Sequence, residues 1–129
     1  MILADTHTAI WLTCDRQLLS QAATEALTSE RNEGGIAISG ITLWEVALLA
    51  TRNSLSIDKT LSAYLEHLES IFIVLPVNGR IGLRATQFTK VYPRDPADRL
   101  IGATALVHGL RLVTADRAIK ASGEVPVVW

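Results

Sequence analysis

Two aspartates stand where predicted strands end, and this placement favours a shared site. Asp5 directly follows the short apolar run 2–4, and Asp116 comes shortly after the predicted strand 110–113, which is apolar except for Arg111. Continuously apolar runs of this kind are typical of parallel strands that are buried on both faces. Ligands of parallel sheets bind at the carboxyl ends of the strands. We therefore expect the carboxylates of Asp5 and Asp116 to lie at the same edge of one sheet.

Two further acidic residues lie on predicted helices that the same topology would bring to this edge. Asp98 is in the first turn of a helix that we expect to begin at Pro96. Glu45 lies four residues from both Ile41 and Leu49, so it points along the apolar stripe of its helix. A carboxylate on such a stripe is costly unless it has a partner. The sequence thus predicts a site of four acids: Asp5, Glu45, Asp98 and Asp116.

Each of the four acids also has a purely local explanation. Asp5 and Asp116 are suited to cap the helices that follow them. The helix dipole favours an acid such as Asp98 near a helix N-terminus. Thr42-x-x-Glu45 matches a capping box, which would tie Glu45 to its own helix. Taken singly these explanations are as good as the functional one, but together they do not account for four acids at one edge.

A cluster of four carboxylates requires protons or a cation. Two carboxylates ~4 Å apart repel by roughly 4 kcal/mol at an effective dielectric constant near 20. Oxygen ligands supplemented by water suit Mg²⁺, with Mn²⁺ as a substitute. The predicted meeting of the acids at one edge of the sheet therefore indicates a site for a divalent cation.

Short apolar runs alternate with amphipathic or capped segments along the whole chain. This alternation predicts an α/β fold, a three-layer α/β/α sandwich with a parallel five-stranded sheet. With 129 residues, we expect a single domain over 1–129. The expected strands are 2–4, 36–38, 71–75, 110–113 and 125–128, and the expected helices are 8–13, 21–31, 41–50, 61–68, 78–90, 96–108 and 116–121.

The composition excludes several classes of protein. Apolar residues make up 49% and charged residues 19%, which excludes a disordered chain. No run reaches about 18 consecutive apolar residues, so we expect no membrane span, and no basic stretch precedes an apolar segment as in a signal peptide. Cys14 is the single cysteine, which excludes a disulfide framework. We expect a cytoplasmic protein.

The basic residues are concentrated in the second half of the chain. Residues 1–79 hold four Lys or Arg and nine Asp or Glu, whereas residues 80–120 hold eight and three. This asymmetry favours an anionic partner, although surface charges also segregate by chance. The candidates for phosphate contact are Arg80, Arg84, Lys90, Arg94 and Arg99.

Aromatic residues are few. We expect Trp11 and Trp44 to be core or interface residues, with base stacking as the less favoured role. His7 is close enough to Asp5 to line its pocket, but a position at the start of a helix is the favoured explanation.

Five stretches of the chain resemble the PIN-domain ribonucleases, and among them the VapC toxins of bacterial toxin–antitoxin pairs. Together they extend over essentially the whole chain, and the blocks around Asp98 and Asp116 are the most specific. The stretches are Leu3–His7, Ser39–Val46, Arg94–Ala103, Leu112–Asp116 and Val125–Trp129. The resemblance implies a parallel α/β/α fold, in agreement with the pattern of the strands.

The resemblance implies a role for each acid. Asp5 and Asp98 correspond to direct metal ligands, Asp116 to a further ligand that often acts through water, and Glu45 to an acid that orients water. Hydrolysis of RNA would leave a 5′-phosphate. Asp95 competes with Asp98 as a ligand, but the Asp95-Pro96 step favours Asp95 as a helix cap.

The resemblance also extends to less certain positions and to partners. Thr114 and, more weakly, Thr6 match hydroxyl positions of the pocket, and Gly102 stands where the family commonly has alanine. The family implies RNA as substrate, a VapB-like antitoxin that places an Arg or Lys near the acids, and a homodimer.

Three alternatives remain open at this point. A PIN-type nuclease of RNA maturation would have the same site without an antitoxin, and a PIN-like binding module would have the fold without activity. A receiver-like Mg²⁺-binding phosphoacceptor would require an aspartate after a central strand, and the run 71–77 contains none. A nucleotide-binding module would require a glycine-rich turn after a strand, which is absent.

Overall fold

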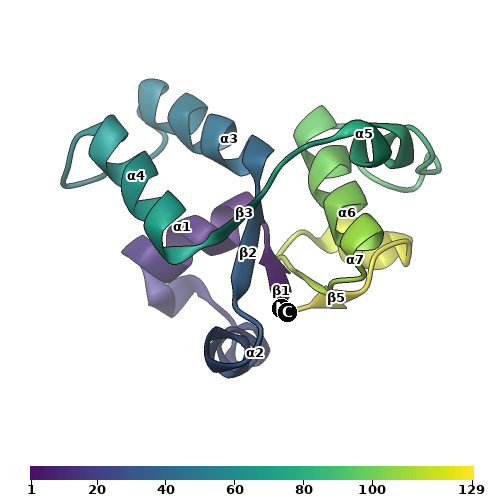
Figure 1. The fold of residues 1–129 in the computed structure, drawn as a ribbon, viewed down its shortest axis with the longest axis horizontal. Coiled ribbons are helices and arrows are strands. Elements are labelled where there is room, and N and C mark those ends of the chain that lie inside the picture. Colours follow the sequence, from purple (N-terminus) through teal and green to yellow (C-terminus); the bar gives the residue numbers. More distant parts are fainter.

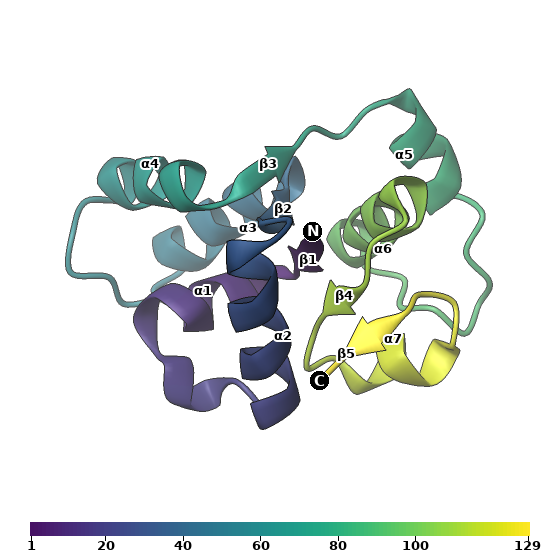
Figure 2. The same ribbon diagram turned by 60° about the horizontal axis from the view of Figure 1, so that its bottom comes forward.

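The computed structural model describes all residues of the chain, 1–129, and its five strands form one parallel sheet in the order β3-β2-β1-β4-β5. Strand β1 is therefore central, between β2 and β4 (Figure 2). The strands are β1 (Ile2–Ala4), β2 (Ile36–Ser39), β3 (Ile73–Leu75), β4 (Leu112–Val113) and β5 (Val127–Val128). The predicted fold class, a parallel five-stranded sheet in an α/β/α sandwich, is confirmed.

Seven α-helices cover the two faces of this sheet. Figure 1 shows α1 to α4 on one side of the strands and α5 to α7 on the other. The helices are α1 (Thr6–Cys14), α2 (Gln21–Asn32), α3 (Gly40–Thr51), α4 (Leu61–Ile71), α5 (Gly79–Ala85), α6 (Pro96–His108) and α7 (Arg117–Ser122), and a single 3₁₀ turn spans Arg16–Leu18. Each of them is too short or too polar to cross a membrane.

The core consists of two apolar clusters, one on each face of the sheet. Successive residues of a strand point to opposite faces, so Ile2 and Ala4 contribute to one cluster and Leu3 to the other. The first cluster is completed by helices α1 to α4, and the second by helices α5 to α7. Strands β1, β2 and β4 are therefore buried on both faces, as their sequences predict. At the two edges of the sheet, Ile73 of β3 is 40% exposed and β5 is only half-buried.

Every α-helix begins at a side chain that accepts a hydrogen bond from its first turn. Such a cap satisfies an amide that has no partner within the helix, and typically contributes about 1 kcal/mol. The caps are Asp5, Ser20, Ser39, Thr60, Asn78, Asp95 and Asp116. The three aspartates among them lie at the carboxyl edge of the sheet. Helix capping, the local explanation, therefore applies to Asp5 and Asp116, and their functional role stays a prediction.

One predicted helix is too long. The expected helix 78–90 ends at Ala85, and the following residues form a loop that leads to α6. The loop is held by tertiary contacts, because Thr89 donates from its amide and its hydroxyl to the Glu124 carboxylate at 3.0 and 2.9 Å. Its carbonyl groups accept hydrogen bonds from Arg99. The prediction for 86–90 was wrong because these distant partners outcompete helical hydrogen bonds.

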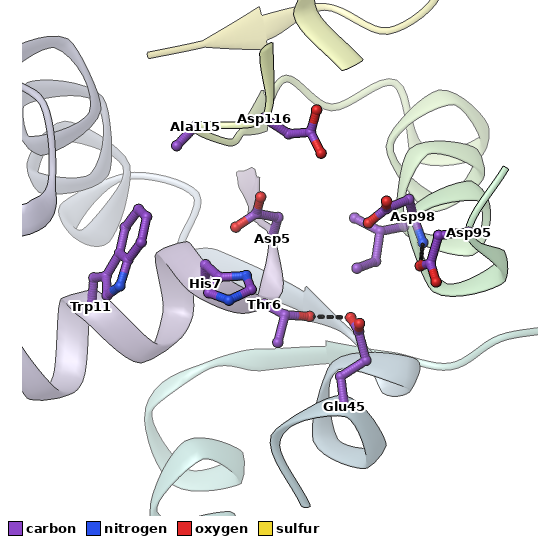
Figure 3. Close-up of a pocket in the computed structure, with 10 residues that line it drawn as sticks. Asp5, Thr6, His7, Trp11, Glu45, Asp95, Asp98, Ala115 and Asp116 are labelled. Carbon is purple, nitrogen blue, oxygen red and sulfur yellow. Dashed lines mark hydrogen bonds between the residues drawn. The ribbon is translucent and has the colours of Figure 1, made fainter. Parts of the chain in front are cut away.

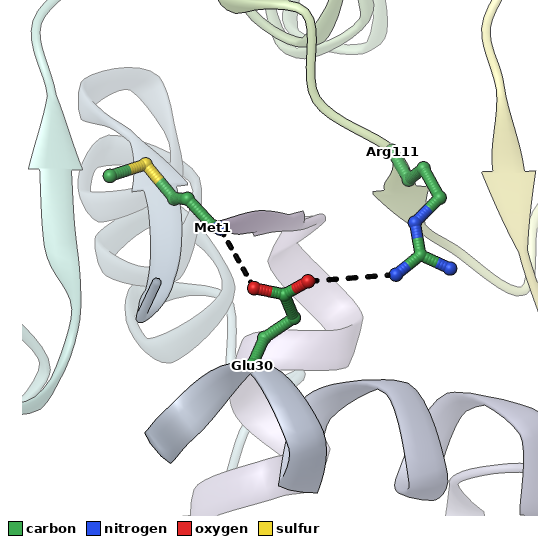
Figure 4. A network of polar contacts seen from close by, with 3 residues as sticks. All are labelled: Met1, Glu30 and Arg111. Carbon is green, nitrogen blue, oxygen red and sulfur yellow. Dashed lines mark hydrogen bonds and ion pairs between the residues drawn. The ribbon is translucent and has the colours of Figure 1, made fainter. Parts of the chain in front are cut away.

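The opposite, amino edge of the sheet is fixed by an ion-pair network around Glu30 of α2. Its carboxylate contacts the amino group of Met1 at 2.7 Å and Nη2 of Arg111 at 3.7 Å (Figure 4). Met1 precedes β1 and Arg111 precedes β4. The hydrogen bond from the amino group lowers the pKa of Glu30 below its ordinary value. The network thus joins α2 to the starts of the two strands whose other ends lead to Asp5 and Asp116.

Candidate active site

All four predicted acids line one pocket at the carboxyl edge of the sheet. The pocket has a volume of about 530 Å³, and no Lys or Arg lines it. Its walls come from α1, α3, α6 and the segment after β4 (Figure 3). The lining residues are Asp5, Thr6, His7, Trp11, Glu45, Asp95, Asp98, Ile101, Ala115 and Asp116.

Asp5 lies at the junction of β1 and α1. Its Oδ1 accepts a hydrogen bond of 2.8 Å from the amide of Thr8, which caps α1. Burial raises the pKa of Asp5, and hydrogen bonds from Thr114 and Thr8 oppose this shift. The backbone therefore fixes a largely buried carboxylate at the base of the pocket.

Asp116 stands in the same way at the start of α7. Its Oδ1 accepts from the amides of Ala118 and Ile119 at 2.8 and 3.1 Å. Its own amide donates to the hydroxyl of Thr114 at 3.1 Å. Thr114 therefore shapes the turn that carries Asp116, and it is itself buried and outside the pocket lining.

Asp95 and Asp98 occupy the first turn of α6 but are placed differently. Asp95 is exposed and caps the helix, because its Oδ2 accepts from the amide of Asp98 at 3.0 Å, as predicted. The Asp98 carboxylate accepts no hydrogen bond from the protein and is half-buried. Burial, followed by the charges of Asp95, Asp116, Glu45 and Asp5, raises the pKa of Asp98 to about 7. The surroundings of Asp98 therefore oppose the charge of its carboxylate.

Glu45 reaches the pocket from α3, and it is not part of a capping box. Ser39 caps α3, with its hydroxyl accepting from the amide of Ile41 at 3.3 Å. The Oε1 of Glu45 instead accepts from the Thr6 hydroxyl at 2.5 Å, and the Thr42 hydroxyl lies 3.1 Å from that of Thr6. Because the single hydroxyl hydrogen of Thr6 goes to Glu45, Thr42 must be the donor to Thr6.

The pKa of Glu45 is shifted in the same direction as those of Asp5 and Asp98. Burial raises the pKa of Glu45, the hydrogen bond from Thr6 lowers it, and the charge of Asp95 raises it further. Thr6 and Thr42 are both buried. The two threonine hydroxyls therefore hold the carboxylate of Glu45 toward the pocket and join α1 to α3. Figure 3 shows the hydrogen bond between Thr6 and Glu45.

The donor set of the pocket fits a hard divalent cation. Its acids offer carboxylate oxygens, the ligands that such ions prefer, and no Lys or Arg balances their charge. The structure contains no group of three or more acidic, His or Cys side chains arranged to ligate one ion together. Mg²⁺ is commonly held by one or two carboxylates and several retained waters. In this arrangement at most two of the side chains could ligate one ion directly.

Comparison with known proteins decides the family, since the sequence model of the PIN domain matches residues 2–124. The chain belongs to the PIN-domain family. This PIN domain is 33% identical over 119 residues to Ribonuclease VapC22 of Mycobacterium tuberculosis, with 92% of this chain and 89% of that protein covered. The resemblance inferred from the five sequence stretches is thereby confirmed.

Solved structures extend this comparison to the fold of the PIN domain. A toxin–antitoxin complex from Klebsiella pneumoniae contains a chain with 26% identity and a TM-score of 0.62, over 90% of this chain and 87% of that one. VapBC-1 from nontypeable Haemophilus influenzae gives a TM-score of 0.73 at 19% identity, over 98% of this chain and 96% of that one. The second similarity concerns the fold alone.

The two tryptophans that were expected to be core or interface residues differ in burial. Trp44 is 56% exposed on α3, so it is not a core residue, and an interface role for it stays a prediction. Trp11 is half-buried against the core, and with His7 it lines the acidic pocket. The sequence contained a signal for this pair, because residues four apart lie on the same face of a helix and Asp5 directly precedes that helix. Ile101, which also lines the pocket, carried no such signal.

The basic residues of the PIN domain lie outside the pocket, and two of the predicted phosphate contacts have other partners. Arg99 donates to the carbonyls of the loop before α6, with distances of 2.9 to 3.4 Å. The guanidinium of Arg84 lies over the Phe88 ring, 5.0 Å from its centroid. The remaining predicted contacts are exposed and available for an anionic partner: Arg80, Lys90 and Arg94.

Proposed function

We propose that this chain is a divalent-metal-dependent endoribonuclease and the toxin of a VapBC-type toxin–antitoxin pair, with the acidic pocket as its active site. One observation carries the proposal: the pocket gathers all four predicted acids, without a Lys or Arg, in a PIN domain that is 33% identical to a ribonuclease. We also propose that residues 1–129 act as a single nuclease domain.

We assign the acids as follows. Asp5 and Asp98 would hold the ion directly, and Asp116 would hold it through water. PIN-domain nucleases of the VapC type generally depend on divalent metals, and we propose Mg²⁺, with Mn²⁺ as a substitute. When bound, such an ion activates water and stabilises the charge that develops on the phosphodiester. Asp116 supports this assignment, since its Oδ1 is engaged by two amides and its Oδ2 is left for the pocket.

Glu45 would act on the attacking water. Its carboxylate is held by the Thr6 hydroxyl, so its orientation is fixed before substrate binds. Burial raises the pKa of Glu45, which makes it a better proton acceptor than an exposed glutamate. The hydrolysis would leave a 5′-phosphate on the RNA. His7, the histidine of the pocket, is not required as a base in this scheme.

The proposed partners are RNA and a VapB-like antitoxin. A cationic side chain from the antitoxin would offset the repulsion among the acids, and the Klebsiella pneumoniae relative is a toxin–antitoxin complex. A homodimer and a cytoplasmic location, where cellular RNA is cut, complete the proposal. The match of the PIN-domain sequence model to residues 2–124 removes the receiver-like alternative. A nuclease of RNA maturation with the same site differs only in lacking an antitoxin.

Expression in cells tests this proposal. We expect the protein alone to arrest growth, the Asp5→Ala variant to be harmless, and a neighbouring small gene to relieve the arrest and co-purify with the protein. The Asp5→Ala variant should be compared at equal soluble levels, because Asp5 also caps α1. Toxicity of this variant equal to that of the parent would contradict the proposed site. RNA cleavage without any antitoxin gene would favour the maturation nuclease.

A further inference from the structure

The acidic pocket has an aromatic wall. His7 and Trp11 lie four residues apart on α1, their ring centroids are 5.8 Å apart, and their planes are inclined by 53°. Figure 3 shows both rings on one side of Asp5, with Asp98 and Asp95 on the other. The pocket thus has a negatively charged end and an aromatic end.

Packing contacts with other side chains fix the position of the Trp11 ring. The centroid of the Trp129 ring lies 5.8 Å from that of Trp11, and Trp11 packs against the buried cluster beneath α1. His7 is exposed. The wall is therefore a fixed indole with an accessible imidazole beside it, and both line the pocket.

The electrostatics of the pocket limit what can hold RNA there. Five carboxylates line it and no Lys or Arg does, so its side chains repel a phosphate. The base of a nucleotide carries no negative charge, so the carboxylates do not repel it. Single-stranded nucleic acid is commonly bound by stacking of its bases on aromatic side chains. Within the pocket, His7 and Trp11 are the only aromatic side chains that can attract a base in this way.

We propose that His7 and Trp11 form a subsite for one unstacked nucleobase of the RNA, next to the phosphodiester at the acids. The inference rests on the proposed ribonuclease function and names a part of the substrate that the acids do not contact. The pocket volume of about 530 Å³ lies within the usual range of sites for small organic groups. Because a base must leave its helix to reach the wall, the subsite selects an unpaired nucleotide at the cut.

Binding to a variant that cannot cut RNA tests the subsite without relying on activity. The Asp98→Asn variant is titrated, in Mg²⁺, with a single-stranded RNA that carries 2-aminopurine, whose fluorescence falls on stacking. Adding His7→Ala or Trp11→Ala is expected to weaken binding by roughly 5- to 150-fold, the value of one stacked base. Trp11→Phe is expected to retain most of the affinity. Trp44→Ala, which removes an exposed indole outside the pocket, is the matched control and is expected to bind as before.

A strand of the same length without bases separates stacking from backbone contact. It is expected to bind weakly, and equally to variants with and without the aromatic wall. The subsite is overturned if His7→Ala and Trp11→Ala leave RNA affinity unchanged, or if they weaken the strand without bases by the same factor. It is also overturned if these variants bind RNA with normal affinity and lose only their binding of the antitoxin. Since His7 is exposed, loss of folding cannot explain its result. Failure of Asp98→Asn itself to bind RNA would contradict the proposed function, and the subsite with it.

Discussion

Gly102 of α6 offers a sharp test of the packing that places Asp98. A Cβ atom added at Gly102 would lie 2.2 Å from Oη and 2.8 Å from Cζ of Tyr92, and 3.0 Å from Cζ of Phe88. Tyr92 is only 1% exposed, and its ring stacks on that of Phe88 at 3.9 Å between centroids. The Tyr92 hydroxyl donates to the carbonyl of Asp98 at 2.8 Å. Gly102→Ala therefore displaces a ring that supports the first turn of α6.

The magnitude follows from two opposing effects. Alanine is favoured over glycine inside a helix by about 1 kcal/mol. Overpacking of a buried site costs about 1–3 kcal/mol, and two stacked, buried rings place Gly102 at the upper end. The net loss of unfolding free energy is about 2 kcal/mol. For 129 residues this corresponds to a fall of roughly 7 °C in melting temperature.

Thermal unfolding of matched variants measures this effect. Gly82→Ala, on α5, is the control, because no atom lies within 4 Å of its added Cβ and only the helix preference acts. We expect Gly82→Ala to raise the melting temperature and Gly102→Ala to lower it. In a Tyr92→Phe background the closest contact is absent, so the loss from Gly102→Ala should shrink. A higher melting temperature for Gly102→Ala would refute the packing argument.

Three further predictions concern the site itself. Thr6→Val removes the hydrogen bond to Glu45 and should slow RNA cleavage by roughly 10- to 100-fold, while Thr6→Ser retains most activity; equal rates for both variants would contradict this. The pKa of Asp98 is about 7 in the fold and ordinarily 3.8. Between these two pH values the folded metal-free protein binds a proton at Asp98 that the unfolded chain does not bind. The free energy of unfolding therefore falls as the pH rises through this range. Because Mg²⁺ competes with that proton, it should raise the melting temperature more above pH 7 than near pH ~5. RNA affinity should fall steeply with salt, and replacing Lys90 and Arg94 by glutamine should reduce the log–log slope by about 0.7 for each lost contact.

The sheet and the meeting of the acids could be predicted from local features. Short, continuously apolar runs identify strands buried on both faces, and parallel strands bring their carboxyl ends together. Asp5 and Asp116 then follow from their positions after β1 and β4. Asp95 was identified as a cap from the proline that follows it.

The errors arose where distant partners replace local hydrogen bonds. The capping-box pattern at Thr42 and Glu45 describes one helix, whereas the actual partner of Glu45 is Thr6 on another. Residues 86–90 contain no glycine or proline that would stop a helix. In the structure, however, Arg99 and Glu124 bind their backbone and side-chain groups. Neither contact has a sequence spacing that reveals it.

Cleavage of RNA by the paired variants Asp98→Asn and Asp95→Asn tests the central claim most directly. The two residues share the first turn of α6, but only Asp98 is a half-buried carboxylate without a hydrogen-bond donor. We expect the parent protein to cut RNA with Mg²⁺ and to lose this activity in EDTA. The Asp98→Asn variant should be folded but inactive. The Asp95→Asn variant should stay active, because asparagine also caps a helix. Undiminished cutting in excess EDTA would contradict the account. An inactive Asp95→Asn variant together with an active Asp98→Asn variant would contradict it as well.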